Sequence, residues 1–200
     1  MNRFFIVALP KKENLEKLNE IRLFFNKNGF RDTRSNNVND AHITLASGVY
    51  KDETQIETIK KTFENTLKKK KPFPVTYDHV TNVHKSANDE KNVAHNWIAL
   101  RFHDKHLQDF SGFCEEILEK LGVSTTREYV EYIHKIDPRS KGESIVGDHM
   151  NMCIWCKPEK AEEAFEKCVE EAPKKIEIAK IAFRYTDENK KVRHAWEIEL

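Results

Sequence analysis

The chain of 200 residues lacks any long hydrophobic run. A helix that crosses a membrane needs about 20 predominantly apolar residues in succession, so the sequence predicts no membrane contact. The apolar stretch closest to the start runs only from Phe4 to Pro10. It is short for a secretory signal and no small-residue cleavage site follows it, so we expect it to form a first β-strand.

A strong net charge is also lacking, because 34 Lys and Arg residues are balanced by 33 Asp and Glu residues. Proteins that hold nucleic acid mainly by electrostatics carry a clear basic excess, and the balance argues against that class. A small nucleotide or an RNA end in a local pocket remains compatible with it. Cysteine is scarce, with four residues in no dense framework, so we expect free thiols in a cytoplasmic protein.

Hydrophobic periodicity predicts an alternation of strands and helices. Strands are expected, before a C-terminal hairpin, at 4–10, 41–47, 96–102 and 149–156, with Gly48 ending the second, and extended chain is expected at 74–84. Helices are expected at 13–28, 53–69, 105–121 and 159–171, with Asp52 as a cap. The order strand, helix, histidine-bearing strand, helix, strand occurs twice. We therefore expect an α+β fold over 1–200: a single bilobal domain with two pseudo-symmetric lobes, each a small antiparallel sheet backed by helices, around a central cleft.

Two short segments, HITL at 42–45 and HMNM at 149–152, each place a histidine two residues before a small hydrogen-bonding side chain. Because residues i and i+2 of a strand point to the same face, His42 is expected beside Thr44, and His149 beside Asn151. Strict alternation adds Ala46 to the face of His42, and Cys153 and Trp155 to the face of His149. The intervening apolar residues are expected to pack against helices, which leaves the two polar half-sites facing each other across the cleft.

Two histidines that face each other across a phosphate suit acid–base catalysis. An imidazole with a pKa near 6.5 exists in both protonation states around neutral pH. A neutral His42 or His149 takes a proton from the attacking hydroxyl or water, and the other, protonated, gives one to the leaving oxygen. Thr44 and Asn151 are placed to hydrogen-bond a phosphate oxygen. This scheme requires no metal and no cofactor.

These segments resemble the motifs of the two-histidine (2H) phosphoesterases of the LigT-like, 2′-5′ RNA ligase group. That family carries two His-x-Thr/Ser motifs on pseudo-symmetric lobes. The opening FFIVALP, the HITLAS strand, the NWIALRF strand and the late HMNM strand follow the family's order over essentially the whole chain. The resemblance implies a metal-independent phosphodiesterase. Its expected partner is a nucleotide or RNA with a 2′,3′-cyclic phosphate, a 2′-5′ linkage or a cyclic (oligo)nucleotide bond, bound by a monomer.

The second motif departs from the family pattern, because Asn151 stands where the family has a hydroxyl residue. An amide still donates to a phosphate oxygen, but its reach and geometry differ. The alternative is therefore a nucleotide- or RNA-end-binding module on the same fold, with little or no catalysis.

The remaining chemical features have plainer interpretations. CIWC at 153–156 lies in a predicted strand, where positions three apart face opposite sides, so we interpret Cys153 and Cys156 as unrelated buried thiols rather than a redox pair. A zinc site made from these thiols and His149 lacks a fourth ligand. Trp155 and, more weakly, Tyr132 are candidates for stacking a base, with an ordinary rim or core position as the alternative.

Overall fold

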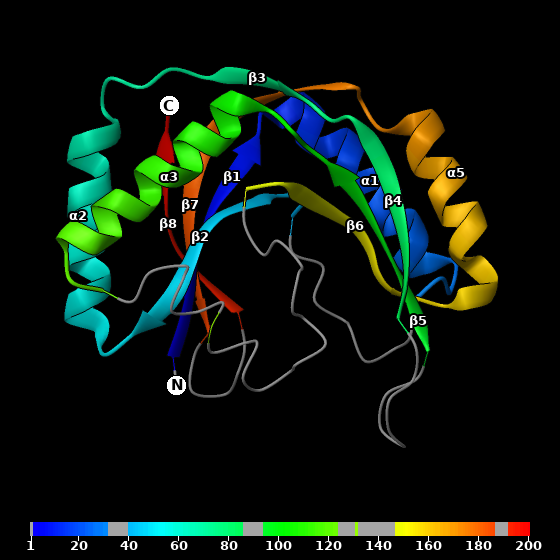
Figure 1. The fold of residues 1–200 in the computed structure, drawn as a ribbon, viewed down its shortest axis with the longest axis horizontal. Coiled ribbons are helices and arrows are strands. Elements are labelled where there is room, and N and C mark those ends of the chain that lie inside the picture. The colour runs from blue at the N-terminus through cyan, green and yellow to red at the C-terminus, as the bar shows by residue number, and fades with distance from the viewer. Residues whose placement is uncertain (1, 32–39, 86–93, 124–130, 132–146, 187–191) are drawn as a thin grey trace.

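The computed structural model describes residues 2–31, 40–85, 94–123, 131, 147–186 and 192–200. Within them lies one eight-stranded antiparallel sheet (Figure 1). Its strands are β1 (Asn2–Pro10), β2 (Ile43–Tyr50), β3 (Phe73–Thr76), β4 (His79–Lys85), β5 (His95–Arg101), β6 (His149–Cys156), β7 (Lys175–Thr186) and β8 (Val192–Glu199). The helices of the described ranges are α1 (Lys12–Lys27), α2 (Glu53–Leu67), α3 (Lys105–Lys120), η2 (Pro158–Lys160) and α5 (Ala161–Glu171).

The sheet has two parts that meet at one residue pair. The strand order is β3-β7-β1-β2-β6-β5-β4, and β8 also pairs with β7. β2 and β6 share a single register pair, Ile43 with Met150, whereas the other neighbouring strands pair over at least four residues. The first part therefore contains β3, β7, β8, β1 and β2, and the second contains β6, β5 and β4. The predicted α+β class is confirmed.

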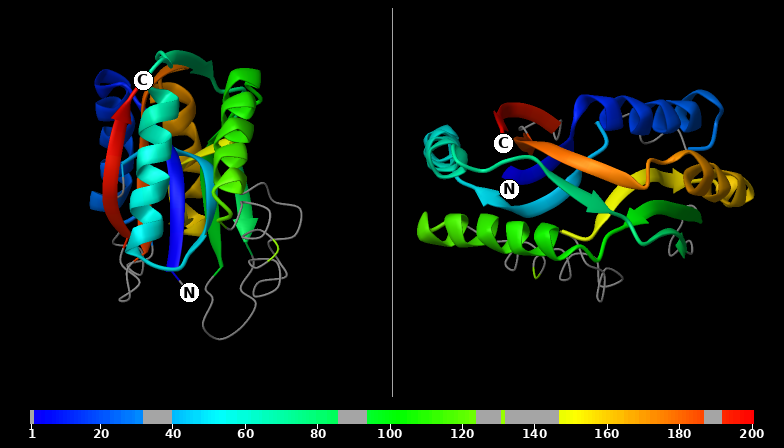
Figure 2. Two further views of the ribbon diagram at one scale, coloured as in Figure 1. Left: turned by 90° about the vertical axis from the view of Figure 1, so that its left-hand side faces the viewer. Right: turned by 90° about the horizontal axis from the view of Figure 1, so that it is seen from above.

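Each part of the sheet takes elements from both halves of the chain. Helices α2 and α3 lie together at the end where α3 packs on β2 and α2 reaches β8, and α1 and α5 lie together at the other end (Figures 1 and 2). Thus α3, β7 and β8 from the second half complete the first part, while α1 and β4 from the first half complete the second. This exchange ties the two parts together although their strands barely pair.

Local signals explain where the helices begin and end. The Asp52 side chain accepts a hydrogen bond from the Gln55 backbone N–H, which confirms the predicted cap of α2. Gly29 and Gly122, just beyond α1 and α3, adopt the left-handed conformation that ends a helix. The expectation that Gly48 ends the second strand is wrong. Gly48 pairs with Phe4 inside the sheet, and β2 continues to Tyr50.

Two apolar clusters occupy opposite faces of the sheet. The larger one fills the space between the sheet and the helices and includes Ile43, Met150, Ala46 and Cys153, all fully buried. A small second cluster on the other face contains Val7, Leu9 and Ala182, with Phe5 packed against it. Among the described residues, none of the helices combines the length and the apolarity that a membrane crossing demands.

Both histidine-bearing strands carry a β-bulge at the same place, one residue after the polar motif residue. In the first part, Val7 pairs with Thr44 but Ile6 pairs with Ala46. In the second part, the bulge falls between the pairs that Asn151 and Cys153 make with β5. The extra residue turns Ala46 and Cys153 toward the helices. The prediction that they share a face with the histidines is therefore wrong for both.

Candidate active site

The two histidine motifs lie at the junction between the two parts of the sheet. Ile43 and Met150 pair across it and point into the core, so the residues that flank them point to the opposite face. In an antiparallel ladder, the register places His42 opposite Asn151 and Thr44 opposite His149. The two histidines are then diagonal neighbours, for which a separation of about 7–8 Å is typical. The two rings are close enough for the charge of His149 to be among the causes that lower the pKa of His42.

His42 sits in a cationic and desolvated environment. Its Nδ1 lies 2.7 Å from the backbone carbonyl oxygen of Asp40. A carbonyl only accepts, so Nδ1 carries the proton and Nε2 of the neutral ring keeps its lone pair. Arg184 Nη1 lies 3.2 Å from the same nitrogen and is itself buried; since a guanidinium only donates, it cannot hydrogen-bond a protonated Nδ1 and acts on His42 through its charge. Burial, then the charge of Arg184, with smaller contributions from Arg22 and His149, lower the pKa of His42 to about 3.

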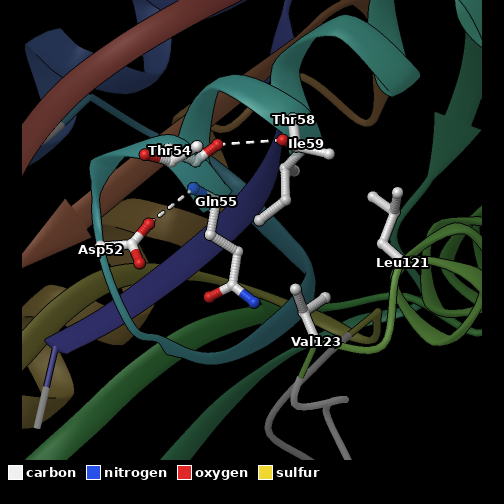
Figure 3. A pocket seen from close by; sticks show the side chains of 7 residues that line it. All are labelled: Asp52, Thr54, Gln55, Thr58, Ile59, Leu121 and Val123. Carbon is white, nitrogen blue, oxygen red and sulfur yellow. Dashed lines mark hydrogen bonds between the residues drawn. The ribbon is translucent and has the colours of Figure 1, made fainter.

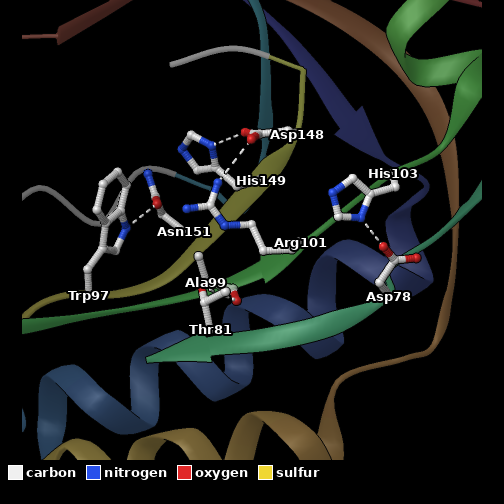
Figure 4. A network of polar contacts seen from close by, with 9 residues as sticks. All are labelled: Asp78, Thr81, Trp97, Ala99, Arg101, His103, Asp148, His149 and Asn151. Atoms are coloured by element: carbon white, nitrogen blue, oxygen red, sulfur yellow. Dashed lines mark hydrogen bonds and ion pairs between the residues drawn. The ribbon is translucent and has the colours of Figure 1, made fainter. Parts of the chain in front are cut away.

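His149 sits in an acidic and aromatic environment (Figure 4). Its Nδ1 lies 2.6 Å from a carboxylate oxygen of Asp148, and the other carboxylate oxygen is 3.0 Å from Arg101 Nη1. The Trp97 ring meets the His149 ring edge to face at a centroid distance of 5.3 Å. The carboxylate fixes the proton on Nδ1, orients the ring and leaves Nε2 for chemistry.

The two polar residues of the motifs differ in how they are held. Thr44 uses its backbone carbonyl to accept from the N–H of Gly147 at 2.6 Å, which ties the start of β6 to β2. Asn151 Oδ1 lies 2.5 Å from the indole Nε1 of Trp97. An indole N–H only donates, so the amide oxygen must face Trp97, and the amide nitrogen is the end left for another partner.

Gly147 shapes the approach to His149. Its φ of +74° lies in the left-handed region, which glycine adopts without strain. An added Cβ would lie 3.2 Å from the hydroxyl oxygen of Ser111, which itself donates to the Leu45 carbonyl. Gly147 therefore lets α3 and the turn before His149 pack closely against β2.

Trp155 lies at the far end of β6. It is 38% exposed, has a φ of +58° and stacks on His95 with a centroid distance of 4.0 Å. His95 and Trp97 alternate on β5, so Trp155 shares the face of Trp97 and Asn151. The two bulges shorten the path: between Asn151 and Cys156 the partner strand β5 advances only three residues, from Ala99 to Asn96, so Trp155 lies within about 10 Å of Asn151 along the strand direction. Tyr132, the other stacking candidate, falls outside the described residues.

The CIWC segment differs from its interpretation as two unrelated thiols. Both thiols are buried, and a second bulge at Ile154 and Trp155 brings their sulfur atoms close enough to shift each other's pKa, while the Cys156 thiol donates to the Lys157 carbonyl. Cys156 and Arg31 lower the pKa of Cys153, while the pKa of Cys156 is raised. Strict strand alternation fails here because the bulge adds a residue between the two.

Other places in the described ranges do not gather the predicted residues. No group of three His, Cys, Asp or Glu side chains there is placed to hold a metal ion. A hollow of about 400 Å³ lies between the start of α2 and the end of α3 (Figure 3). Its polar lining residues, such as Gln55 and Thr58, are engaged in the first turns of α2, and none of the predicted site residues lines it.

Sequence reasoning missed four residues that surround the histidines: Asp148, Arg101, Trp97 and Arg184. Asp148 had a usable signal, since an acid directly before a histidine can reach its Nδ1. Arg184 had none, because it lies 142 positions from His42 in the chain and meets it only through the pairing of β7 with β1.

No protein-family model matches the chain, and no curated protein matches it. Solved structures do. Escherichia coli LigT in complex with 3′-AMP is 10% identical, with coverage of 100% of this chain and 98% of that chain, at a TM-score of 0.57. A protein described as a phosphoesterase is 11% identical, with coverage of 100% and 99%, at a TM-score of 0.54. LigT in complex with phosphate is 10% identical, with coverage of 100% of this chain and 98% of that chain, at a TM-score of 0.51. The chain therefore has the fold of the LigT-like phosphoesterases.

Proposed function

We propose that this protein is a metal-independent phosphodiesterase that acts on a 2′,3′-cyclic phosphate, a 2′-5′ linked oligonucleotide or a cyclic (oligo)nucleotide. His42 and His149 are its acid–base pair, and Thr44 and Asn151 hold the phosphate. Both half-sites, 42–45 and 149–152, come from one chain, so we propose that 1–200 works as a single bilobal domain and as a monomer. Its four thiols suit the cytoplasm.

One observation carries the proposal. Each histidine has its Nδ1 engaged by an oxygen, from the Asp40 carbonyl or from the Asp148 carboxylate, and both rings lie on the same face beside one register pair. Both Nε2 atoms are thereby left for a ligand between them. LigT, which shares the fold, has been solved with 3′-AMP and with phosphate, and these ligands agree with a nucleotide phosphate as substrate.

The surroundings of the two rings assign their roles. The lowered pKa of His42 keeps it neutral, so its Nε2 accepts the proton of the attacking water or ribose hydroxyl. Asp148 holds Nδ1 of His149, whose Nε2 is the proton donor to the leaving ribose oxygen. One P–O bond forms and another breaks. The net transfer leaves His42 protonated and His149 neutral, and exchange with water restores the starting state.

The phosphate itself adjusts the base. With a pKa of about 3, His42 is a weak acceptor in the absence of a ligand. An anionic phosphodiester beside Arg184 offsets the guanidinium charge and raises the pKa of His42 toward neutrality, where a general base is most effective. Substrate binding and base activation are therefore coupled at this half-site.

Turnover assays test the proposal. The protein is incubated with 2′,3′-cyclic nucleotides and with a 2′-5′ dinucleotide, with and without a chelator, beside His42→Ala, His149→Ala and the control His106→Ala, whose side chain is exposed on α3. We expect the chelator to leave turnover unchanged. His42→Ala and His149→Ala should each lower the turnover rate about 100-fold or more, whereas His106→Ala should not. Tight nucleotide binding without turnover would replace the proposal with the binding-module alternative. Loss of turnover with chelator would contradict it.

A further inference from the structure

We propose that Trp97 is a positioning residue that turns the amide nitrogen of Asn151 toward the substrate phosphate. This inference rests on the proposed function. It explains why the second motif carries an amide where the first has a hydroxyl, and it gives Asn151 one fixed hydrogen-bonding direction.

The contact itself sets the direction of the amide. Trp97 Nε1 and Asn151 Oδ1 are 2.5 Å apart, and the donor-only indole occupies the oxygen (Figure 4). The indole ring also meets His149 edge to face, and Lys85 Nζ lies 5.8 Å from its centroid. Trp97 thus touches both residues of the second motif. Held in this way, Asn151 presents only N–H groups to a ligand, which suits an anionic phosphate oxygen and no donor group.

The first half-site supplies an internal comparison. Thr44 pairs with Val7 on β1, and Asn151 pairs with Ala99 on β5, and a bulge follows at the same position in both strands. Two residues back along β1 and β5 lie Phe5 and Trp97, which are therefore structural equivalents.

The two pairs are chemically matched. Phe5 packs against the small apolar cluster and has no donor, and the motif of the same half-site carries Thr44, whose short hydroxyl needs none. Trp97 has a donor, and its partner Asn151 has an amide whose oxygen must be occupied before its nitrogen is fixed. At equivalent positions, the first half-site thus combines Phe5 with Thr44, and the second combines Trp97 with Asn151.

A double-mutant cycle in kcat/KM tests the inference with Trp97→Phe, Asn151→Thr and the double variant, which recreates the Phe–Thr pair of the first half-site. We expect Trp97→Phe to lower kcat/KM about tenfold when Asn151 is present, and by less than about twofold when Thr stands at 151. The loss should appear mainly in KM, because the phosphate contact weakens while the histidines remain. Equal losses in both backgrounds, as a merely structural role of Trp97 predicts, would overturn the inference.

Two further variants separate the effect of side-chain size from the effect of hydrogen bonding. Trp196→Phe removes an indole N–H that is buried on β8 with no hydrogen-bond partner among the described residues, and we expect kcat/KM to stay unchanged. Asn151→Asp keeps an acceptor for Trp97 but replaces the amide donor with a negative charge, and we expect a loss larger than that of Trp97→Phe. An Asn151→Asp variant as active as wild type would contradict a donor role.

A binding measurement distinguishes failure of this inference from failure of the proposed function. Inorganic phosphate is titrated into ¹⁵N-labelled protein, and the side-chain amide signals of Asn151 are followed. We expect them to shift in wild type and to lose that response in Trp97→Phe, while the fold remains intact by its backbone spectrum. An unchanged response in Trp97→Phe overturns the positioning role alone. No phosphate binding and no turnover in wild type overturn the proposed function, and this inference with it.

Discussion

The two half-sites share one backbone design and differ in nearly every neighbour. Each has a histidine just before or at the start of a strand, a polar residue two positions later and a bulge after that. Around His42 the charges are positive, from Arg184 and Arg22, and Nδ1 binds a backbone carbonyl. Around His149 a carboxylate binds Nδ1, and an aromatic ring covers the side.

This difference explains how similar motifs can do opposite work. A carbonyl fixes the tautomer of a ring but adds no charge, and nearby guanidinium groups oppose protonation. A carboxylate fixes the tautomer and also stabilises the imidazolium. On the proposed mechanism, the backbone aims the two Nε2 atoms at the phosphate, and their different neighbours suit His42 as the base and His149 as the acid. Four predictions break or sharpen this comparison.

The largest effect is expected from Asp148→Asn. The amide retains the shape of the side chain but loses the charge that supports His149, so kcat should fall about 10- to 100-fold. The matched variant is Asp40→Asn. His42 uses the backbone carbonyl of Asp40, which this change leaves in place, and the carboxylate that it removes is exposed and 4.0 Å from Arg184, so its effect should stay below about fivefold. Similar losses in steady-state kcat for the two variants would show that these neighbours do not give the two half-sites different roles.

A smaller effect is expected from Arg184→Gln, read from the pH profile. Removal of the guanidinium beside Nδ1 raises the pKa of His42 from about 3 toward its ordinary value, although burial, the larger cause, remains. The acid limb of kcat/KM should therefore move to higher pH. At neutral pH, kcat/KM should fall about tenfold, because the positive charge of Arg184 near the anionic phosphate is lost.

The control for Arg184→Gln is Arg193→Gln, which removes an exposed arginine on β8. It should leave the acid limb in place. An acid limb that stays fixed in Arg184→Gln as well would mean that His42 is not the base.

The lowered pKa of His42 also predicts how stability depends on pH. The unfolded chain binds a proton at His42 below about pH 6.5, whereas the folded protein binds it only near pH 3, so the free energy of unfolding should fall as the pH drops through this window. The slope from this residue should be about 1 kcal/mol per pH unit. Urea unfolding of wild type and His42→Gln between pH 7 and pH 4 measures it. The comparison supports the prediction only if the variant loses less stability on acidification, while His106→Gln behaves as wild type.

The sequence was sufficient to predict the helices and strands, and to predict which residues lie on one face of each histidine-bearing strand, because helix and strand periodicity are local. It located β6 at 149–156, the boundaries of the helices to within a few residues, and the cap at Asp52. The bulges were out of reach, since a bulge exists only relative to a partner strand. Ala46, Cys153 and the contact between Cys153 and Cys156 were misplaced for that single reason.

The smallest effect is expected from Trp155→Ala, which tests whether the second part of the sheet extends the site. Trp155 packs against His95 at the end of β6, within about 10 Å of Asn151 along the strand direction, so we expect it to reach a base of a substrate that continues beyond the nucleotide at the scissile phosphate. We expect a 2′,3′-cyclic mononucleotide to be turned over within about twofold of wild type, and the KM of a longer oligonucleotide to rise about fivefold or more, as the loss of one stacked base predicts. The comparison of KM between the two substrates checks this. Equal effects on both would place Trp155 in the fold rather than in substrate binding, and would confine recognition to the two histidine half-sites.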